Sequence, residues 1–158
     1  MRTRLFLPSV VFALTLQPAL LQGQQLIVEN EAGKQTQLTR TDLEALPRIK
    51  VPTGTSATFE GVALGALLAK AGVEFGETLR GKRLASCLLV EAADGYRAVI
   101  ALPELDPAFT DKQIVLAFLK DGKPLDDKEG PYRIVIPDEK RMARWVRQVR
   151  VLKIVDVQ

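Results

Sequence analysis

The sequence has no histidine and a single cysteine among its 158 residues. The absence of histidine excludes a Ser-His-Asp triad, an H-E-x-x-H zinc site, a C2H2 zinc finger and a C-x-x-C-H haem attachment site. One cysteine excludes both an intramolecular disulfide and a CxxC metal cluster. Glycine-rich phosphate loops and the G-x-S-x-G nucleophile elbow are also missing. These absences remove most of the common catalytic and metal-binding motifs.

The composition is that of an ordinary globular protein. Hydrophobic residues make up 47% of the chain and charged residues 26%, which excludes a collagen and argues against disorder. The net charge of +3 falls to +1 without the first 23 residues, because Arg2 and Arg4 lie there. The remaining charge gives no indication of nucleic acid or membrane as a partner.

The first 23 residues have the features of a secretory signal peptide. Arg2 and Arg4 are followed by an apolar stretch, Leu5–Leu16, and the segment ends in small and polar residues near Gly23. The apolar stretch is shorter than the roughly 20 residues of a membrane-spanning helix. We therefore expect a signal peptide over residues 1–23, one domain over residues 24–158 and a periplasmic or secreted location. An uncleaved membrane anchor is the alternative.

Short apolar segments separated by turns dominate the rest of the chain. The turns Asp94-Gly95 and Asp121-Gly122 indicate hairpins, and so favour antiparallel and mixed pairing over a βαβ array. We predict an α+β fold with β-rich mixed or antiparallel sheets and short helices. The expected strands are Leu26–Val28, Thr36–Leu38, Lys50–Val51, Ala57–Phe59, Leu84–Ala92, Tyr96–Ala101, Ile114–Leu119, Tyr132–Ile136 and Val149–Val157.

Two helices are indicated. The clearer one spans Val62–Ala71, where Leu64, Leu67, Leu68 and Ala71 share one face and Gly72 provides a left-handed end. A shorter helix is expected after a capping box at Thr41–Glu44, and Pro47 should end it. Leu84–Ala92 is almost continuously apolar, which predicts a strand buried on both faces.

Few side chains offer chemistry. Cys87 could ligate a soft metal or act as a nucleophile, but without a histidine to activate it a small buried hydrophobe is the favoured interpretation. Glu104, Asp106 and Asp111 lack the regular spacing of a calcium loop, so we expect them to form a solvated acidic surface.

Basic residues accumulate near the C-terminus. Arg141, Arg144, Arg147 and Arg150 recur every three residues, and their guanidinium groups would point to one side if the segment were helical. Such a side would suit phosphate or carboxylate oxygens. A solvated basic rim paired with acidic neighbours is an equally good interpretation. Trp145 is expected to pack in or at the edge of the core.

Several strings in the chain match the pattern of one known family. They are Phe59-Glu60-Gly61-Val62-Ala63-Leu64 with Leu67-Leu68 and Ala71-Gly72-Val73, then Asp94-Gly95-Tyr96, Asp121-Gly122-Lys123-Pro124-Leu125, and Gly130-Pro131-Tyr132-Arg133 to Trp145-Val146. Their order and spacing resemble the sulfite-oxidase-type molybdopterin-binding domain, in particular its short secreted members, over residues 26 to 157. The resemblance implies a β-rich α+β domain that holds a molybdenum pterin cofactor and oxidises or reduces small oxo-acceptors.

The resemblance also implies candidate site residues and shows where this chain departs from the pattern. The family's ligand cysteine commonly precedes a V-E pair, and here Leu89 precedes Val90-Glu91. Cys87 lies two residues earlier, which in a strand is the same face about 6.5 Å away. If the cofactor binds, Cys87 is the expected molybdenum ligand, and Arg133, Arg141 and Arg144 would bind its phosphate or an oxyanion.

These features leave three functional hypotheses. The first is an exported relative that has lost the molybdenum ligand and acts as a binding or accessory module for a small anion. The second is a minimal molybdopterin-dependent oxidoreductase that uses Cys87. The third is a structural partner of another exported redox protein. Because fold does not decide function, we favour the first on the missing ligand and the missing histidine.

Overall fold

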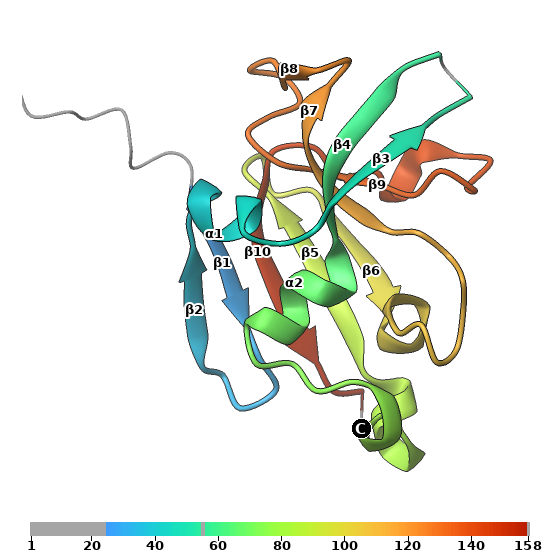
Figure 1. Ribbon diagram of the computed structural model, residues 1–158. Coiled ribbons are helices and arrows are strands. Elements are labelled where there is room, and N and C mark those ends of the chain that lie inside the picture. The colour runs from blue at the N-terminus through green and yellow to red at the C-terminus, as the bar shows by residue number, and fades with distance from the viewer. Residues whose placement is uncertain (1–24, 55, 158) are drawn as a thin grey trace, which may run out of the picture.

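The computed structural model describes residues 25–54 and 56–157, which form two sheets and a few short helices (Figure 1). The expected signal peptide at residues 1–23 lies outside these residues. The α+β prediction with mixed, β-rich sheets is confirmed.

The first sheet has the strand order β2-β1-β10-β5-β6. Its strands are β1 (Leu26–Glu29), β2 (Gln35–Leu38), β5 (Cys87–Ala92), β6 (Arg97–Ala101) and β10 (Val149–Val155). The pairing of β1 with β10 is parallel and the other pairings are antiparallel. The C-terminal strand therefore lies in the middle of the sheet, between the two hairpins.

The second sheet is antiparallel, with the order β3-β4-β7-β8, and β9 also pairs with β7. Its strands are β3 (Arg48–Pro52), β4 (Thr58–Ala63), β7 (Val115–Lys120), β8 (Lys123–Pro124) and β9 (Arg133–Val135). β7 pairs with β4 on one side and with β8 and β9 on the other, so it is the central strand of this sheet.

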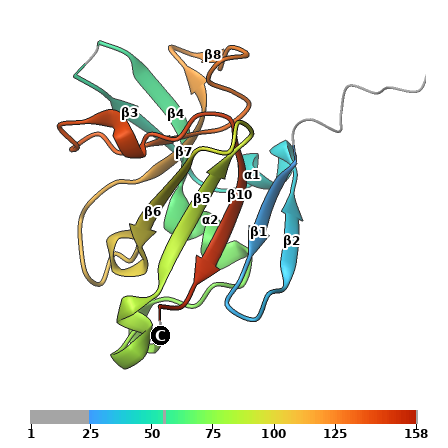
Figure 2. The ribbon, with the colours of Figure 1, turned by 180° about the vertical axis from the view of Figure 1, so that it is seen from behind.

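Two α-helices lie on one face of the first sheet. They are α1 (Arg40–Glu44) and α2 (Leu64–Lys70), and the opposite face of the sheet, seen in Figure 2, carries no helix among the described residues. Four 3-10 helices connect other elements: η1 (Gly76–Thr78), η2 (Gly81–Ala85), η3 (Leu102–Leu105) and η4 (Met142–Arg144).

The first sheet is buried on its helix-covered face only. Along β5, Leu88, Val90 and Ala92 are buried, whereas Cys87 and the other alternate positions are half-buried. The prediction that Leu84–Ala92 is buried on both faces is therefore wrong, because the uncovered face leaves every second side chain in contact with solvent. Strands buried on both faces lie in the second sheet: Val115–Phe118 of β7 are all buried, and so are residues 59–62 of β4.

Both α-helices lie where the sequence predicted a helix, but each begins at a different residue from the one expected. The expected apolar face of α2 is confirmed, since Leu64, Leu67 and Leu68 are fully buried. The capping box was expected two residues too late. Thr39 is the N-cap of α1, and the Asp42 carboxylate accepts a hydrogen bond of 2.8 Å from the Thr39 backbone N–H.

Two glycines allow close contacts between elements. A Cβ atom at Gly61 would lie 2.0 Å from the Leu116 carbonyl oxygen, and one at Gly65 would lie 2.2 Å from the Leu105 carbonyl oxygen. The first contact lets β4 pair closely with β7 through a bulge. The second fixes the start of α2 against η3.

Candidate functional site

Cys87 begins β5 and belongs to the uncovered face of the first sheet. It is paired with Val155 of β10 and Ala101 of β6. Leu89, two residues along, is half-buried on the same face, as the spacing predicted. Cys87 therefore lies on the side of the sheet away from the core, within a strip of mainly aliphatic neighbours.

The surroundings of the Cys87 sulfur disfavour its ionised form. Its pKa is raised, first by partial burial and then by the negative charge of Asp156. Asp156 in turn accepts a hydrogen bond of 2.5 Å from the Ser86 hydroxyl. A metal-bound cysteine must be a thiolate, which positive neighbours favour. The surroundings of Cys87 therefore favour the protonated thiol over the free thiolate.

The residues around Cys87 offer little else for a metal centre. Within residues 25–54 and 56–157, no group of three or more Cys, Asp or Glu side chains is placed to hold a metal ion. A cavity of about 490 Å³ lies beside the residue preceding Cys87, but Cys87 does not line it. Its lining residues are Lys82, Arg83, Ala85, Ser86, Asp156 and Val157.

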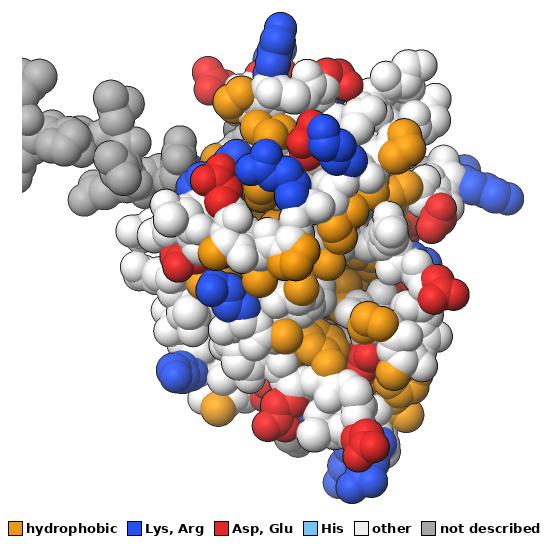
Figure 3. All heavy atoms as spheres, viewed as in Figure 1, with side chains coloured by type: hydrophobic (Ala, Val, Ile, Leu, Met, Phe, Trp, Pro, Cys, Tyr) orange, Lys and Arg blue, Asp and Glu red, His pale blue; other side chains and the backbone are white. Residues whose placement is uncertain are grey.

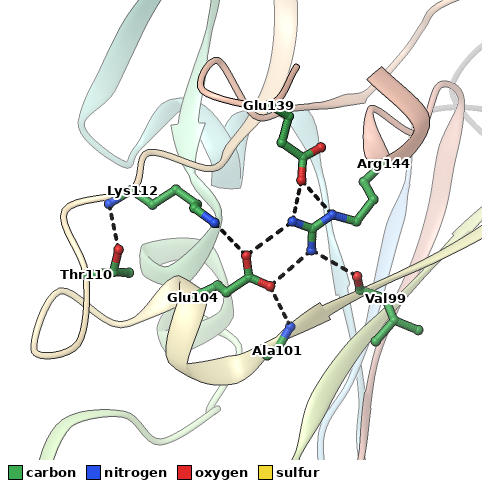
Figure 4. A network of polar contacts seen from close by, with 7 residues as sticks. All are labelled: Val99, Ala101, Glu104, Thr110, Lys112, Glu139 and Arg144. Carbon is green, nitrogen blue, oxygen red and sulfur yellow. Dashed lines mark hydrogen bonds and ion pairs between the residues drawn. The ribbon is translucent and has the colours of Figure 1, made fainter. Parts of the chain in front are cut away.

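Arg144 lies at the centre of a network of charged groups that joins three segments (Figure 4). Its guanidinium donates to the Glu139 carboxylate at 2.7 Å and to the Glu104 carboxylate at 3.0 Å. Lys112 approaches the same Glu104 carboxylate at 2.8 Å. Hydrogen bonds from Arg144 lower the pKa of Glu104 to about 2, with a further contribution from Lys112, although partial burial opposes the change. The charge of Arg144 is thus balanced within the protein.

Arg144 also covers part of an open sheet edge. One of its nitrogen atoms donates to the Val99 carbonyl oxygen of β6 at 3.3 Å. Nearby, the Tyr96 hydroxyl donates to the Ala143 carbonyl oxygen at 2.7 Å. Since β6 ends the first sheet, these bonds attach η4 to its free edge, and the Arg144 bond occupies the Val99 carbonyl oxygen, with which another chain could otherwise pair.

Arg133 is largely buried and, like Arg144, is paired with a nearby carboxylate. Its guanidinium forms an ion pair with Glu129 and lies 5.3 Å from the centre of the Phe59 ring and 5.6 Å from the centre of the Trp145 ring. Burial lowers the pKa of Arg133, while the charge of Glu129 raises it. The Arg133 Nε has no hydrogen-bond partner. Arg133 therefore packs as a cation between aromatic rings, and Trp145 is buried as expected.

The arginines of residues 141–150 do not share a helical face. The helix in this region, η4, has only three residues, and β10 begins at Val149. The helical arrangement we considered for Arg141–Arg147 is therefore wrong, because a three-residue turn followed by a strand points successive side chains in different directions. Arg141, Arg147 and Arg150 are exposed. No hydrogen bond or ion pair joins Cys87 with Arg133, Arg141 or Arg144 in the described part of the chain.

A cavity of about 470 Å³ lies beside α2 and was not anticipated from the sequence. We call it the α2 cavity, and it is lined by Ile49, Ala63, Gly65, Ala66, Ala69, Phe75, Glu104–Asp106, Pro107 and Thr110–Val115. The expectation of a solvated acidic surface holds for Asp111, which is exposed, but not for Asp106, which is only 3% exposed. No sequence motif predicts this cavity, because its walls come from segments that are far apart in the sequence.

The chain is similar to a family of known oxidoreductase domains. The sequence profile of the family "Oxidoreductase molybdopterin binding domain" matches residues 51–157. A search of curated proteins finds no significant match.

A solved structure shows the same fold. The sulfane dehydrogenase SoxCD from Paracoccus pantotrophus superposes with a TM-score of 0.64 and 22% sequence identity. The match covers 85% of this chain but only 38% of the SoxCD chain, so this chain spans a minor part of that neighbour's length. No helix in the described residues is long and apolar enough to span a membrane.

Proposed function

Since this chain belongs to the oxidoreductase molybdopterin-binding domain family, we propose that it is an exported member that works without molybdenum, as a binding or accessory module. In this proposal residues 1–23 direct export to the periplasm or the exterior and residues 24–158 form the working domain. A small anion or an exported redox protein is its partner.

The observation that carries the proposal is the position of the lone sulfur donor. Cys87 is the first residue of β5 and lies two residues before Leu89, and its charged neighbour Asp156 is negative rather than positive. Leu89 occupies the position before Val90-Glu91 and has no donor atom. Together these features support loss of the molybdenum ligand.

The arginines support the same conclusion. Arg133 is paired with Glu129, and Arg144 with both Glu104 and Glu139. A cofactor phosphate would have to compete with these carboxylates for each guanidinium. Arg141 is exposed and has no ion-pair partner among the described residues, so it is the most available of the three for an external anion.

The family match favours one alternative, a minimal molybdopterin-dependent oxidoreductase. In that case Cys87 would hold the metal, and Arg133, Arg141 and Arg144 would hold the phosphate of the pterin or an oxyanion. The SoxCD neighbour is named a sulfane dehydrogenase, which would suggest a sulfur compound as the substrate in this alternative. This chain matches only 38% of the SoxCD chain, however, and the similarity extends to the fold alone.

Metal and pterin analysis tests the proposal. The whole chain, purified from a molybdenum-replete host that makes the cofactor, should contain neither molybdenum nor a fluorescent oxidised pterin in amounts close to the protein. Two variants make the result specific. Cys87→Ser should behave as wild type, and Leu89→Cys reports whether a sulfur donor alone restores loading. Near-stoichiometric molybdenum that disappears in Cys87→Ser would establish the oxidoreductase alternative instead.

A further inference from the structure

We propose that the α2 cavity is a binding site for a small apolar molecule that carries a cationic group. The inference rests on the proposed function in one respect, because a module without its family's cofactor needs a ligand site of another kind. The cavity volume of about 470 Å³ lies within the range of sites for small organic ligands.

One wall of the cavity is made by small side chains of α2. Ala66 and Ala69 are exposed on the helix surface and line the cavity, whereas Leu64, Leu67 and Leu68 face the core. Larger residues at these two positions would fill the space. Figure 3 shows apolar side chains gathered in a recess on this face of the molecule, with charged groups around it. The apolar lining residues are Ile49, Ala63, Ala66, Ala69, Phe75, Leu105, Pro107, Ile114 and Val115.

The cavity is held in shape by contacts on both sides. Gly65 of α2 meets the Leu105 carbonyl of η3 so closely that no Cβ atom fits between them. Opposite α2, the Lys112 ammonium is 2.8 Å from the Glu104 carboxylate, which ties the loop after η3 back to η3 itself. A site whose walls are already fixed loses less entropy when a ligand binds.

The charges around the cavity do not cancel. The network of Figure 4 is internally neutral, because Arg144 and Lys112 balance Glu104 and Glu139. Two further acidic residues, Asp106 and Asp111, line the cavity.

Neither of these two carboxylates has a basic side chain as partner among the described residues. Asp106 is buried and accepts hydrogen bonds from the Gly76 N–H at 2.6 Å and the Ala108 N–H at 2.9 Å. Asp111 is exposed and makes no ion pair within the described part of the chain. The cavity therefore has a negative potential that attracts a cation and repels an anion such as a phosphate.

Three probes with one skeleton and different head groups test this assignment. Phenylbutylamine, phenylbutanol and phenylbutyrate share the apolar part and carry a positive, a neutral and a negative group. We expect titration calorimetry on the whole chain to rank them amine, alcohol, acid, with about five-fold between the first two, which is the upper range for an exposed charge pair.

Matched variants connect the binding to the cavity. Asp111→Asn should weaken the amine by about three- to five-fold and leave the alcohol unchanged, since it removes one exposed charge. Ala66→Leu should weaken all three probes by about ten-fold or more, because it fills the cavity. Asp127→Asn and Ala32→Leu make the same changes at exposed positions away from the cavity and should leave binding unchanged. All four positions are exposed, so thermal melts should confirm intact folds.

Three outcomes would overturn the assignment: no binding of any probe to wild type, equal binding of all three, or unchanged binding in Ala66→Leu. These results are separate from the molybdenum analysis. A molybdenum-free protein that binds no probe contradicts only the cavity assignment, and a molybdenum-loaded protein that binds the amine contradicts only the proposed function.

Discussion

Replacement of Glu104 by glutamine should destabilise the protein in a pH-dependent manner. The substitution keeps the size of the side chain and removes the charge that Arg144 and Lys112 both contact, at 3.0 and 2.8 Å. The three segments that these residues join, η3, the loop after it and η4, would then be held less tightly. Because Glu104 contacts both basic residues of this network, Arg144 and Lys112, it is the most informative position in it.

The magnitude follows from the lowered pKa of Glu104. A fall from 4.5 to about 2 corresponds to about 3 kcal/mol if the whole effect appears as stability. Glu104 is 26% exposed and its partners Arg144 and Lys112 are 30% and 33% exposed, so solvent screening reduces the expected loss to about 1–2 kcal/mol. The melting temperature of Glu104→Gln should fall by about 3–8 °C at neutral pH.

The pH dependence has a definite sign. The pKa of Glu104 is lower in the folded protein than in the unfolded chain, so its contribution is complete above about pH 4.5 and is lost as the pH falls toward about 2. The free energy difference between wild type and Glu104→Gln should therefore be largest near neutral pH. It should shrink across this acid range, because wild-type Glu104 then becomes protonated.

Urea unfolding of both proteins, repeated from about pH 7 to about pH 2.5, measures this difference directly. Glu77→Gln is the control, since Glu77 is exposed and makes no ion pair in the described part of the chain. The reasoning is refuted if Glu104→Gln is no less stable than Glu77→Gln at pH 7, or if its deficit stays the same at every pH.

Three further predictions follow from particular contacts. Gly61→Ala should lower the free energy of unfolding by about 2 kcal/mol or more, because its Cβ would lie 2.0 Å from the Leu116 carbonyl, whereas Gly54→Ala, with nothing within 4 Å, should have little effect in the same urea titration. Thr39→Ala should cost about 1 kcal/mol by loss of the N-cap of α1, and an unchanged denaturation midpoint would contradict the capping role. Cys87 should react with iodoacetamide more slowly than free cysteine at neutral pH, and Asp156→Asn should speed the reaction, because the raised pKa leaves little thiolate; a rate above that of free cysteine would contradict this environment.

Local patterns predicted much of the fold. The apolar face of α2 followed from the spacing of Leu64, Leu67 and Leu68, and the left-handed conformations at Gly72, Gly95 and Gly122 followed from turn chemistry. These features depend on residues close together in the chain, so the sequence alone contains the information. The hairpin turns predicted the mixed pairing that the two sheets show, and the resemblance added the family, which the profile over residues 51–157 bears out.

Features that depend on neighbours distant in the sequence were not predicted. β5 appeared from its composition to be buried on both faces, but nothing in its own residues shows that one face of its sheet has no helix over it. The charges of Arg144 and Glu104 lie 40 residues apart, and only folding brings them into contact. The α2 cavity was not predicted for the same reason. The small residues of α2 that line it are ordinary helix formers, and nothing in the helix sequence shows that the loop containing Asp111 lies opposite them.

The molybdenum-to-protein ratio of the whole chain, measured by elemental analysis after production in a molybdenum-replete host that makes the pterin cofactor, tests the central claim most directly. The account predicts a ratio far below one, unchanged by Cys87→Ser. A ratio close to one in the wild type that falls to background in Cys87→Ser would contradict it.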